Sequence, residues 1–411
     1  MLTESQIANC ARYVLERARY VIESFGPRPP GSEAERKTQE LVKADLEAYC
    51  DGPVSIEEFR VAQKAFFSMQ AISGVLTLAA VGLYWVHPIW TFVMATLSAV
   101  VMYNQLLRYH LFLDPFFPTK TSCNVSGRIA PKGKVERRII LNGHPDAAYE
   151  WRFNYRAPRL FPATVLYTLL GLIVLLVGSI VGTVALLAAP VTLGWLVYAI
   201  GILIALFAPA GVIGILFNNF SVVAGGANDN LSGTFIATGI LRAFREHGVQ
   251  LERTELMAVI TGSEEAGLRG AKEWARRHAR DCSDVETIVI SLETFGDLPH
   301  LAIYNRDMNG TVPLDSDTCN LFKRAAQATG RELPFSSVHL GSSDAAAFAQ
   351  EGFKAAMFGG MDPHPAHYYH NRRDSWEIMS ESCIKAAIEV LLAAIHEYDT
   401  KSVRMACGEE A

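Results

Sequence analysis

Two long stretches of the chain contain no charged side chain and interrupt an otherwise mixed pattern of polar and apolar residues. Neither Ala65–Leu107 nor Leu160–Asn228 contains an aspartate, glutamate, lysine or arginine. A helix needs roughly 20 apolar residues to cross the hydrocarbon core of a bilayer, so each stretch is long enough for two spans. Buried core helices are the alternative, but core helices rarely run this long without a charge. The pattern predicts four membrane-spanning helices.

A proline inside each stretch divides it into a helical hairpin, because proline ends a helix. The turns fall at His87-Pro88 and Ala189-Pro190. The expected spans are Met69–Val86, Ile89–Leu107, Pro162–Ala188 and Val191–Phe217. Since a hairpin returns the chain to the side it left, we expect the hydrophilic segments 1–64, 108–159 and 218–411 to lie on one side of the membrane.

Basic side chains flank the spans on that side, whereas the opposite turns carry none. They are Arg60, Lys64, Arg108, Arg152, Arg156 and Arg159. The positive-inside rule places this side in the cytoplasm. Seven scattered cysteines without a CxxC pair indicate a reducing compartment, and no apolar signal-peptide region is present near the N-terminus. The expected localisation is an integral, multi-pass membrane protein with four spans and a cytoplasmic hydrophilic part.

Outside the hairpins, short apolar runs typical of strands alternate with amphipathic helix patterns. The strand runs are Arg138–Asn142, Leu256–Thr261, Thr287–Leu292 and Ala355–Phe358. The helix patterns are Ser232–His247, Ala271–Arg280, Ser316–Thr329 and Glu381–Tyr398. This alternation predicts an α/β fold with a mostly parallel, mixed sheet sandwiched by helices. We expect one discontinuous domain (1–64, 108–159 and 218–411) with hairpins inserted at 65–107 and 160–217.

Composition adds two limits to this picture. Half of the 411 residues are hydrophobic, which is unusual for a soluble protein, and the excess lies in the two uncharged stretches. The net charge is -5 and no basic cluster stands out, so nucleic-acid binding is not expected.

Acidic and histidine-bearing motifs follow three of the predicted strands, at the edge where α/β sheets bind ligands. His144-Pro145-Asp146 pairs an imidazole with a carboxylate that can orient it. Glu264 and Glu265 are adjacent carboxylates, which are costly unless a cation binds them. Glu293 ends an apolar strand, where a charge is expected to be paired or metal-bound.

Two further segments offer candidate ligands. Asp229 lies at a loop-to-helix junction inside Gly225–Gly233, whose small residues allow close backbone approach, although it could simply cap the helix. His364, His367 and His370 lie within seven residues, and any one of them could bind a metal.

In their order along the chain, these motifs closely resemble the M28 metallopeptidases, the co-catalytic zinc aminopeptidases, and their glutaminyl cyclase relatives. The resemblance covers nearly all of the hydrophilic part. It starts at FGPRPPGS (Phe25–Ser32) and continues through HPD, GANDNLSG, SEEAG and ISLETFG to SSDAAAF (Ser342–Phe348) and YYHNRRD (Tyr368–Asp374). The chain departs from the family pattern at Ala345, where Ser-Asp-His is common, and in its two hairpins.

The resemblance implies two Zn²⁺ ions per chain. His144 and Glu293 would hold one ion, Glu265 and His370 the other, and Asp229 would bridge both. The family's Tyr-His motif is what favours His370 over the two neighbouring histidines.

It also implies catalytic roles. Glu264 would be the general base and Asp146 would orient His144. Either Tyr368 or Tyr369 would help to stabilise the oxyanion, and we take Tyr369 as the candidate.

The expected function is a membrane-integrated di-zinc metallohydrolase that cleaves a peptide or amide bond, as an aminopeptidase-like exopeptidase. The alternatives are a glutaminyl-cyclase-like transferase with one zinc held by Asp229, Glu265 and His370, an N-acyl amino acid amidohydrolase, and a non-catalytic membrane receptor or scaffold. The expected partners are the lipid bilayer and a peptide or amide substrate, amphipathic if the active-site edge lies near the bilayer. A homo-oligomer stays open, since small residues of the second hairpin could support close helix packing. They are Gly171, Gly178, Ser179 and Gly182.

Overall fold

The four predicted strands form the centre of a nine-stranded mixed sheet in the computed structural model, which describes residues 2–364 and 366–400. The strand order is β1-β2-β6-β3-β7-β11-β8-β10, with β9 paired to β8. The bounds are β1 (Ser55–Val61), β2 (Lys120–Ile129), β3 (Arg137–Gly143), β6 (Thr254–Ile260), β7 (Glu286–Phe295), β8 (Leu301–Asp307), β9 (Val312–Pro313), β10 (Phe335–Ser337) and β11 (Lys354–Gly360). β4 (Tyr149–Trp151) and β5 (Asn218–Val223) form a separate two-stranded sheet.

The central strands β6, β3, β7 and β11 are parallel, and the antiparallel pairs lie toward the two edges. Gly143 pairs with Ile260, and Glu293 pairs with Gly359. The carboxyl ends of the four strands therefore meet at one edge. The predicted fold class, an α/β fold with a mixed sheet between helices, is confirmed.

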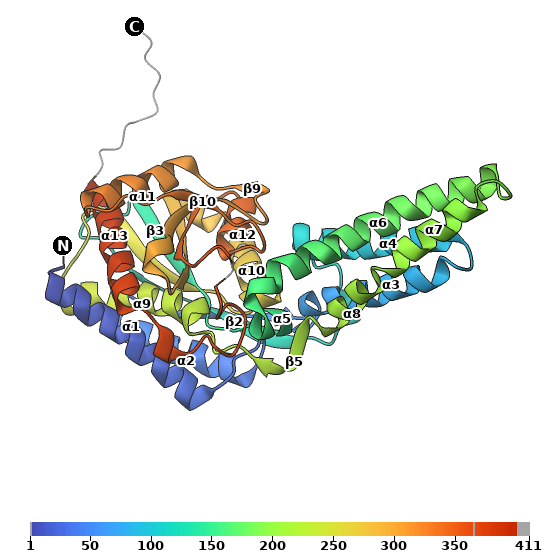
Figure 1. Ribbon diagram of the computed structural model, residues 1–411. Helices are drawn as coiled ribbons and strands as arrows, with labels where there is room; N and C mark the ends of the chain where they lie inside the picture. Colours follow the sequence, from blue (N-terminus) through green and yellow to red (C-terminus); the bar gives the residue numbers. More distant parts are fainter. Residues whose placement is uncertain (1, 365, 401–411) are drawn as a thin grey trace, which may run out of the picture.

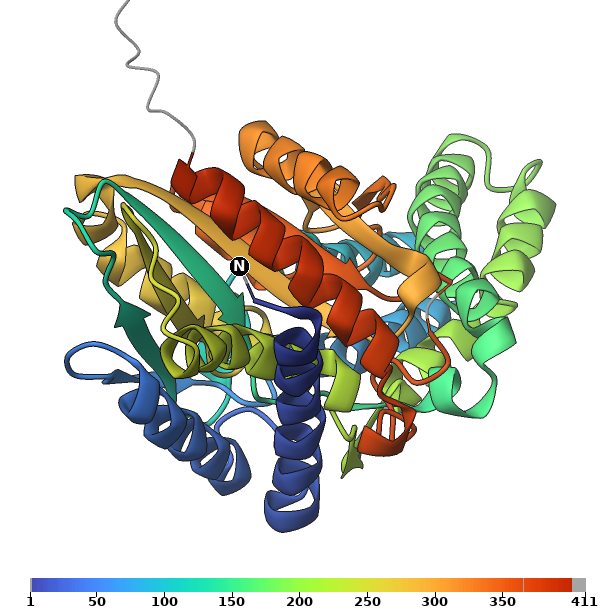
Figure 2. The ribbon, with the colours of Figure 1, turned by 90° about the vertical axis from the view of Figure 1, so that its left-hand side faces the viewer.

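Helices cover both faces of the sheet. α1 (Glu4–Phe25), α2 (Glu33–Tyr49), α9 (Gly233–Glu246), α11 (Ser316–Ala328) and α13 (Glu381–Thr400) pack together on one face. In Figure 2, α13 lies across the strands of this face, with α1 below it. α10 (Arg269–His278) and α12 (Asp344–Gln350) cover the other face. The core between them is built from fully buried side chains such as Ile140, Phe235 and Phe348.

Not every element was predicted from the pattern. The four predicted strands and four predicted helices all form, with ends within a few residues of the expected ones. β1, β2, β8, α1 and α2 were not predicted. β1 shows why: its sequence SIEEFRV is mostly polar and largely exposed at the sheet edge, so it contains no apolar run to detect.

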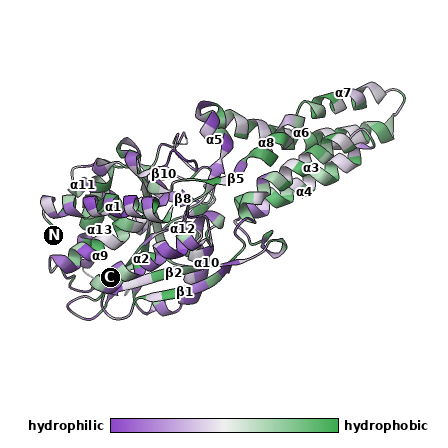
Figure 3. Ribbon diagram, turned by 90° about the horizontal axis from the view of Figure 1, so that it is seen from below, coloured by the Kyte–Doolittle hydropathy of each residue, from purple (hydrophilic) through white to green (hydrophobic). Residues whose placement is uncertain are grey.

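The uncharged stretches form an arm of helices that extends from one side of the α/β body (Figure 1). Its helices are α3 (Met69–Leu83), α4 (Pro88–Met102), α6 (Phe161–Ala188), α7 (Gly194–Ala205) and α8 (Ala208–Leu216), and the short α5 (Arg152–Arg156) precedes α6. Four helical segments are long and apolar enough to cross a membrane. Figure 3 shows little hydrophilic colour along the arm.

One span differs from the prediction. The expected single helix over Val191–Phe217 begins only at Gly194 and consists of two helices, α7 and α8. The break precedes Pro209, which has no N–H to donate and restricts the backbone of the residue before it.

The two hairpins pack against each other as one bundle. A Cβ atom on Gly74 of α3 would lie 2.5 Å from the carbonyl oxygen of Gly211 on α8, so only glycine allows this approach. A Cβ atom on Gly182, one of the predicted small packing residues, would lie 2.3 Å from the phenol oxygen of Tyr84 in the first hairpin. The small residues therefore serve contacts within this chain.

Both hairpins leave the body near the same edge of the sheet. The first follows β1, which runs parallel to β6 because each is antiparallel to β2. The second lies between β4 and β5. The arm thus begins beside the carboxyl ends of the central strands.

Candidate metal centre

The candidate ligands converge at this edge from five places in the chain. His144 directly follows β3, and Glu265 lies in a short 3-10 turn after β6. Glu293 lies within β7, which continues to Phe295 rather than ending where predicted. Asp229 lies in an irregular turn before α9, and His370 in the loop after β11.

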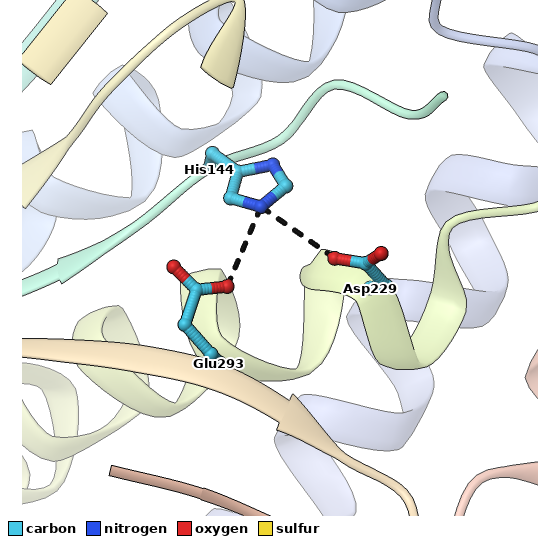
Figure 4. Close-up of side chains that lie close together, drawn as sticks. All are labelled: His144, Asp229 and Glu293. Atoms are coloured by element: carbon cyan, nitrogen blue, oxygen red, sulfur yellow. Dashed lines mark ion pairs between the residues drawn. The ribbon is translucent and has the colours of Figure 1, made fainter. Parts of the chain in front are cut away.

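His144, Asp229 and Glu293 form one possible ligand group, named here the His144 group (Figure 4). Nε2 of His144 lies 3.6 Å from Oδ1 of Asp229 and 3.5 Å from Oε2 of Glu293. All three residues are buried.

Asp229, Glu265 and His370 form a second group, named here the His370 group. Nε2 of His370 lies 3.2 Å from Oδ2 of Asp229 and 3.2 Å from Oε2 of Glu265. Asp229 belongs to both groups and offers a different oxygen to each. The position predicted to bridge two ions is thus the one that the two groups share.

These carboxylates need a cation. Among the described residues, their ion-pair contacts are only to the two histidines. Burial and the charge of Asp229 raise the pKa of Glu265 well above its usual range. One oxygen of Glu265, Oε1, is buried without a hydrogen-bond partner. Buried charges in proteins are paired or coordinate metals, so the site fits bound metal ions.

The donor set favours zinc. Each group offers one imidazole nitrogen and carboxylate oxygens from two residues, and catalytic zinc sites use three such ligands with a position left open. The second ring nitrogen of a ligating histidine is normally held by a carboxylate or carbonyl. Asp146 is placed for this role at His144, with its Oδ1 3.3 Å from Nδ1.

Asp146 has a second role that the sequence did not indicate. It is fully buried and accepts hydrogen bonds from the backbone N–H groups of Glu264 and Glu265, both at 3.1 Å. One carboxylate therefore contacts both the histidine after β3 and the acidic turn after β6.

Glu264 belongs to neither group but lies beside them, with Oε2 3.7 Å from Nε2 of His144. Burial, with the charges of Asp344 and Glu265, raises its pKa well above the usual range and outweighs the charge of His144. Its place next to both groups fits the predicted role of a base, because it leaves both of its oxygens outside the ligand sets.

Arg28 and Asp374 hold the loop that carries Asp229. Asp374 accepts hydrogen bonds from the backbone N–H groups of Asn228 and Asp229. Arg28, fully buried, donates to the carbonyl oxygens of Pro145 and of the two glycines before the loop. Both residues lie in motifs that resemble the family. Their hydrogen-bond partners are far away in sequence, so local patterns did not indicate this role.

Asn230 and Gly233 fix the same loop against β7. Asn230 donates to Oε2 of Glu293 and to the carbonyl oxygen of Leu292. A Cβ atom on Gly233 would lie 2.1 Å from that carbonyl. The small residues around Asp229 thus allow close packing on protein backbone. Asp229 is not a helix cap, since α9 has no side-chain cap.

The alternative histidines and tyrosines lie in different surroundings. His364 and His367 are exposed, and His364 pairs with Asp362. The hydroxyl of Tyr368 donates to Asp297 at 2.7 Å. The ring of Tyr369 stacks on His370 with centroids 3.9 Å apart.

The segment that departs from the family pattern lies next to the groups. Asp344 begins α12 and accepts a hydrogen bond from the hydroxyl of Thr261. Burial raises the pKa of Asp344 to about 7. Ala345, where the family often has histidine, is fully buried in the first turn of α12.

Trp151 connects the site to the arm and was not predicted. Its ring lies 4.4 Å from that of His370 and stacks on Phe161, the first residue of α6, at 5.4 Å. Its backbone N–H donates to the carbonyl oxygen of His370. The foot of the second hairpin therefore touches a candidate ligand.

Comparison with known proteins supports the resemblance. The model of peptidase family M28 matches residues 212–395, which include Asp229, Glu264, Glu265, Glu293 and His370 but not His144. No curated protein sequence gives a match.

Solved structures share the fold at low sequence identity. A zinc aminopeptidase from Bacillus subtilis is 14% identical with a TM-score of 0.56, and 96% of each chain is covered. An aminopeptidase from Aneurinibacillus sp. strain AM-1 is 13% identical with a TM-score of 0.56 and the same coverage. A glutaminyl cyclase from an Acidobacteriales bacterium is 14% identical with a TM-score of 0.54, covering 95% of each chain. The chain is similar to both enzyme types in fold.

Proposed function

We propose that this chain, an M28-family metallopeptidase-like enzyme by its family match and fold, hydrolyses a peptide or amide bond at two zinc ions. Its action would be that of an aminopeptidase-like exopeptidase. The observation that carries the proposal is the position of Asp229, which offers Oδ1 to the His144 group and Oδ2 to the His370 group. A single-metal site would have no need of the first group.

Zinc held by the two groups would polarise the substrate carbonyl and lower the pKa of a water molecule toward neutrality. Glu264 would take a proton from that water as the carbon–oxygen bond forms. It would then return the proton to the leaving nitrogen as the carbon–nitrogen bond breaks. Asp146 would keep His144 and the Glu264 turn in register, and the Tyr369 hydroxyl would donate to the oxyanion.

The test begins with protein purified in detergent. We expect two zinc ions per chain by elemental analysis. We also expect hydrolysis of at least one substrate in a panel of aminoacyl, peptide and N-acyl amide compounds. A chelator should abolish this hydrolysis, and zinc should restore it. A panel without any chelator-sensitive hydrolysis would argue against the proposal and favour a receptor.

The variant Glu264→Gln tests the base. It keeps the side-chain shape but cannot accept a proton, so we expect kcat to fall by about 10²- to 10⁴-fold. Zinc content should be unchanged, because Glu264 lies outside both groups. Full turnover in this variant at normal zinc content would show that another group acts as the base.

A glutaminyl-cyclase-like transferase is the second candidate. The His370 group alone would supply the three ligands of one zinc, and glutaminyl cyclases are among the similar structures. One zinc per chain, no loss of metal in His144→Ala, and cyclisation of an N-terminal glutamine would favour this function.

We also propose that the arm is embedded in a membrane and that the body lies on its cytoplasmic side. Four segments of the arm are long and apolar enough, and they leave large apolar side chains exposed, such as Leu187, Val191 and Trp195. Exposed apolar surface of this extent marks a membrane or protein contact. The basic residues at the feet of the hairpins support the orientation.

A further inference from the structure

We propose that the substrate is an amide of a long acyl chain, and that its hydrocarbon tail stays in the bilayer and lies in a groove at the foot of α3. This inference rests on the proposed amide hydrolysis at two zinc ions, and it assigns an acyl amide as the substrate in place of a peptide with a free N-terminus. The acyl carbonyl would be the one attacked.

The groove is apolar. Its volume is about 380 Å³, and its lining residues come from α3, the residue before it and one later loop. They are Ser68, Ala71, Ile72, Val75, Leu76 and Phe117. Five of these six side chains are apolar, which suits a hydrocarbon chain.

The groove adjoins the acidic turn of the site through Phe66. Phe66 packs in the same apolar cluster as Ile72 and Phe117. Its ring also lies close to Gly267, directly after the turn that carries Glu264 and Glu265, because a Cβ atom added to Gly267 would be 2.9 Å from the ring. A tail in the groove would therefore be attached to a head group at the metal centre without crossing a polar surface.

Tyr109 completes this passage. It follows the first hairpin, is almost fully buried, and packs its ring 4.9 Å from that of Phe66. Burial, with the nearby charge of Glu264, raises the pKa of Tyr109 well above its usual range. Tyr109 thus packs on Phe66 at the foot of the arm, and its carbonyl oxygen accepts a hydrogen bond from Lys272 of α10.

The level of the groove relative to the membrane follows from the loop after the first hairpin. Leu111, Phe112 and Phe116 are exposed there, and Leu160 is exposed at the start of the second hairpin. Exposed Arg108 and Arg159 lie beside them. Large apolar side chains next to basic ones are typical of an interface with lipid. The groove, further along α3, would then lie inside the near leaflet.

The reaction balances as a hydrolysis. Water supplies the oxygen that forms the new bond to the acyl carbon, and the carbon–nitrogen bond breaks. One proton passes through Glu264 to the leaving nitrogen. The products are a fatty acid, which stays in the bilayer, and a soluble amine.

The test uses full-length, zinc-loaded protein in vesicles of phosphatidylcholine and phosphatidylglycerol. Release of leucine is measured from N-hexadecanoyl-leucine and from N-acetyl-leucine. We expect kcat/KM to be at least about tenfold higher for the long chain, because the bound tail contributes binding energy. Ala71→Trp fills the groove and should remove that advantage while leaving N-acetyl-leucine hydrolysis unchanged. Leu97→Trp, exposed on α4 and outside the groove, is the matched control and should change neither rate.

A second measurement does not depend on turnover or on correct folding of a variant. N-hexadecanoyl-leucine with a diazirine on its tail is irradiated with chelator-treated wild-type protein in the same vesicles. We expect cross-links in residues 68–76 and at Phe117, and competition by unlabelled N-hexadecanoyl-leucine.

Three outcomes would overturn the inference and leave the proposed function standing. They are equal kcat/KM for the two substrates, hydrolysis of aminoacyl substrates only, and cross-links spread evenly over the arm, which would mean that bulk lipid or a second copy covers the groove. Absence of hydrolysis across the whole panel, aminoacyl substrates included, would instead remove the proposed function.

Discussion

Asp146 is the residue on which the arrangement of the site most depends. Its two oxygens reach His144 on one side and two consecutive backbone N–H groups, those of Glu264 and Glu265, on the other. A carboxylate has acceptors only, whereas an amide has one acceptor oxygen and an NH₂ group. Replacement by asparagine therefore cannot satisfy the same partners.

We predict that Asp146→Asn weakens metal binding by about 10- to 100-fold, the usual effect of losing the partner of a ligating histidine. The loss should be larger for the ion of the His144 group, since the His370 group does not include His144. Zinc titration against a competing chelator measures the affinity of each ion, and elemental analysis measures how many ions remain bound.

The matched control is Asp297→Asn, which alters a carboxylate that binds Tyr368 and lies outside both groups. It should retain both ions at normal affinity. Equal loss of both ions in Asp146→Asn would mean that the turn, and not the histidine, is what Asp146 supports.

At the scale of elements, α10 anchors the foot of the first hairpin. Lys272 donates to the carbonyl oxygen of Tyr109, and Arg269 pairs with Asp114 at 2.7 Å. Burial, and then the charge of Arg269, lowers the pKa of Lys272 to about 7. The charged form of Lys272 is thus disfavoured in the folded protein.

This shift predicts a pH dependence of stability. Between about pH 7 and the ordinary lysine pKa of about 10.4, the unfolded chain binds a proton at Lys272 that the folded chain does not. Stability attributable to this residue therefore rises with pH across that window. Relative to Lys272→Met, which cannot titrate, the wild-type melting temperature in detergent should increase from pH 7 to pH 9.

The control for this experiment is Lys134→Met, because Lys134 is exposed in a loop. It should follow the wild type at every pH. A constant difference between wild type and Lys272→Met over the window would mean that Lys272 is charged in the folded protein.

At the scale of the whole molecule, the arm and the candidate metal centre share one edge of the body. The second hairpin reaches His370 through Trp151, and the first reaches the Glu264 turn through Phe66. An arm that only tethered the body could be attached anywhere on its surface. Its attachment on both sides of the site would bring the surface of the proposed membrane close to the candidate metal centre.

The proposed orientation predicts a labelling pattern. In a Cys407→Ser background, Lys134→Cys lies on the body and Thr192→Cys at the far turn of the second hairpin, and both positions are exposed. A membrane-impermeant maleimide should label Thr192→Cys in intact cells and Lys134→Cys only in inverted vesicles. The described cysteines other than Cys50 are buried, so background labelling should be low. The reverse pattern would place the body outside the cytoplasm.

The sequence by itself determined the hairpins, the central strands and the set of candidate ligands. A charge-free stretch, a buried apolar strand and a family motif are all local properties that neighbouring residues define. Even so, Pro209 divided a span whose composition alone predicted one helix.

The tertiary structure decided which of these residues meet and what holds them. The two oxygens of Asp229 face different histidines, and Asp146 binds a turn 118 residues away. Such contacts depend on the register of parallel strands far apart in sequence, which no local pattern specifies. The physical reason is burial: a charge without water must find a partner, and only the folded chain brings that partner to it.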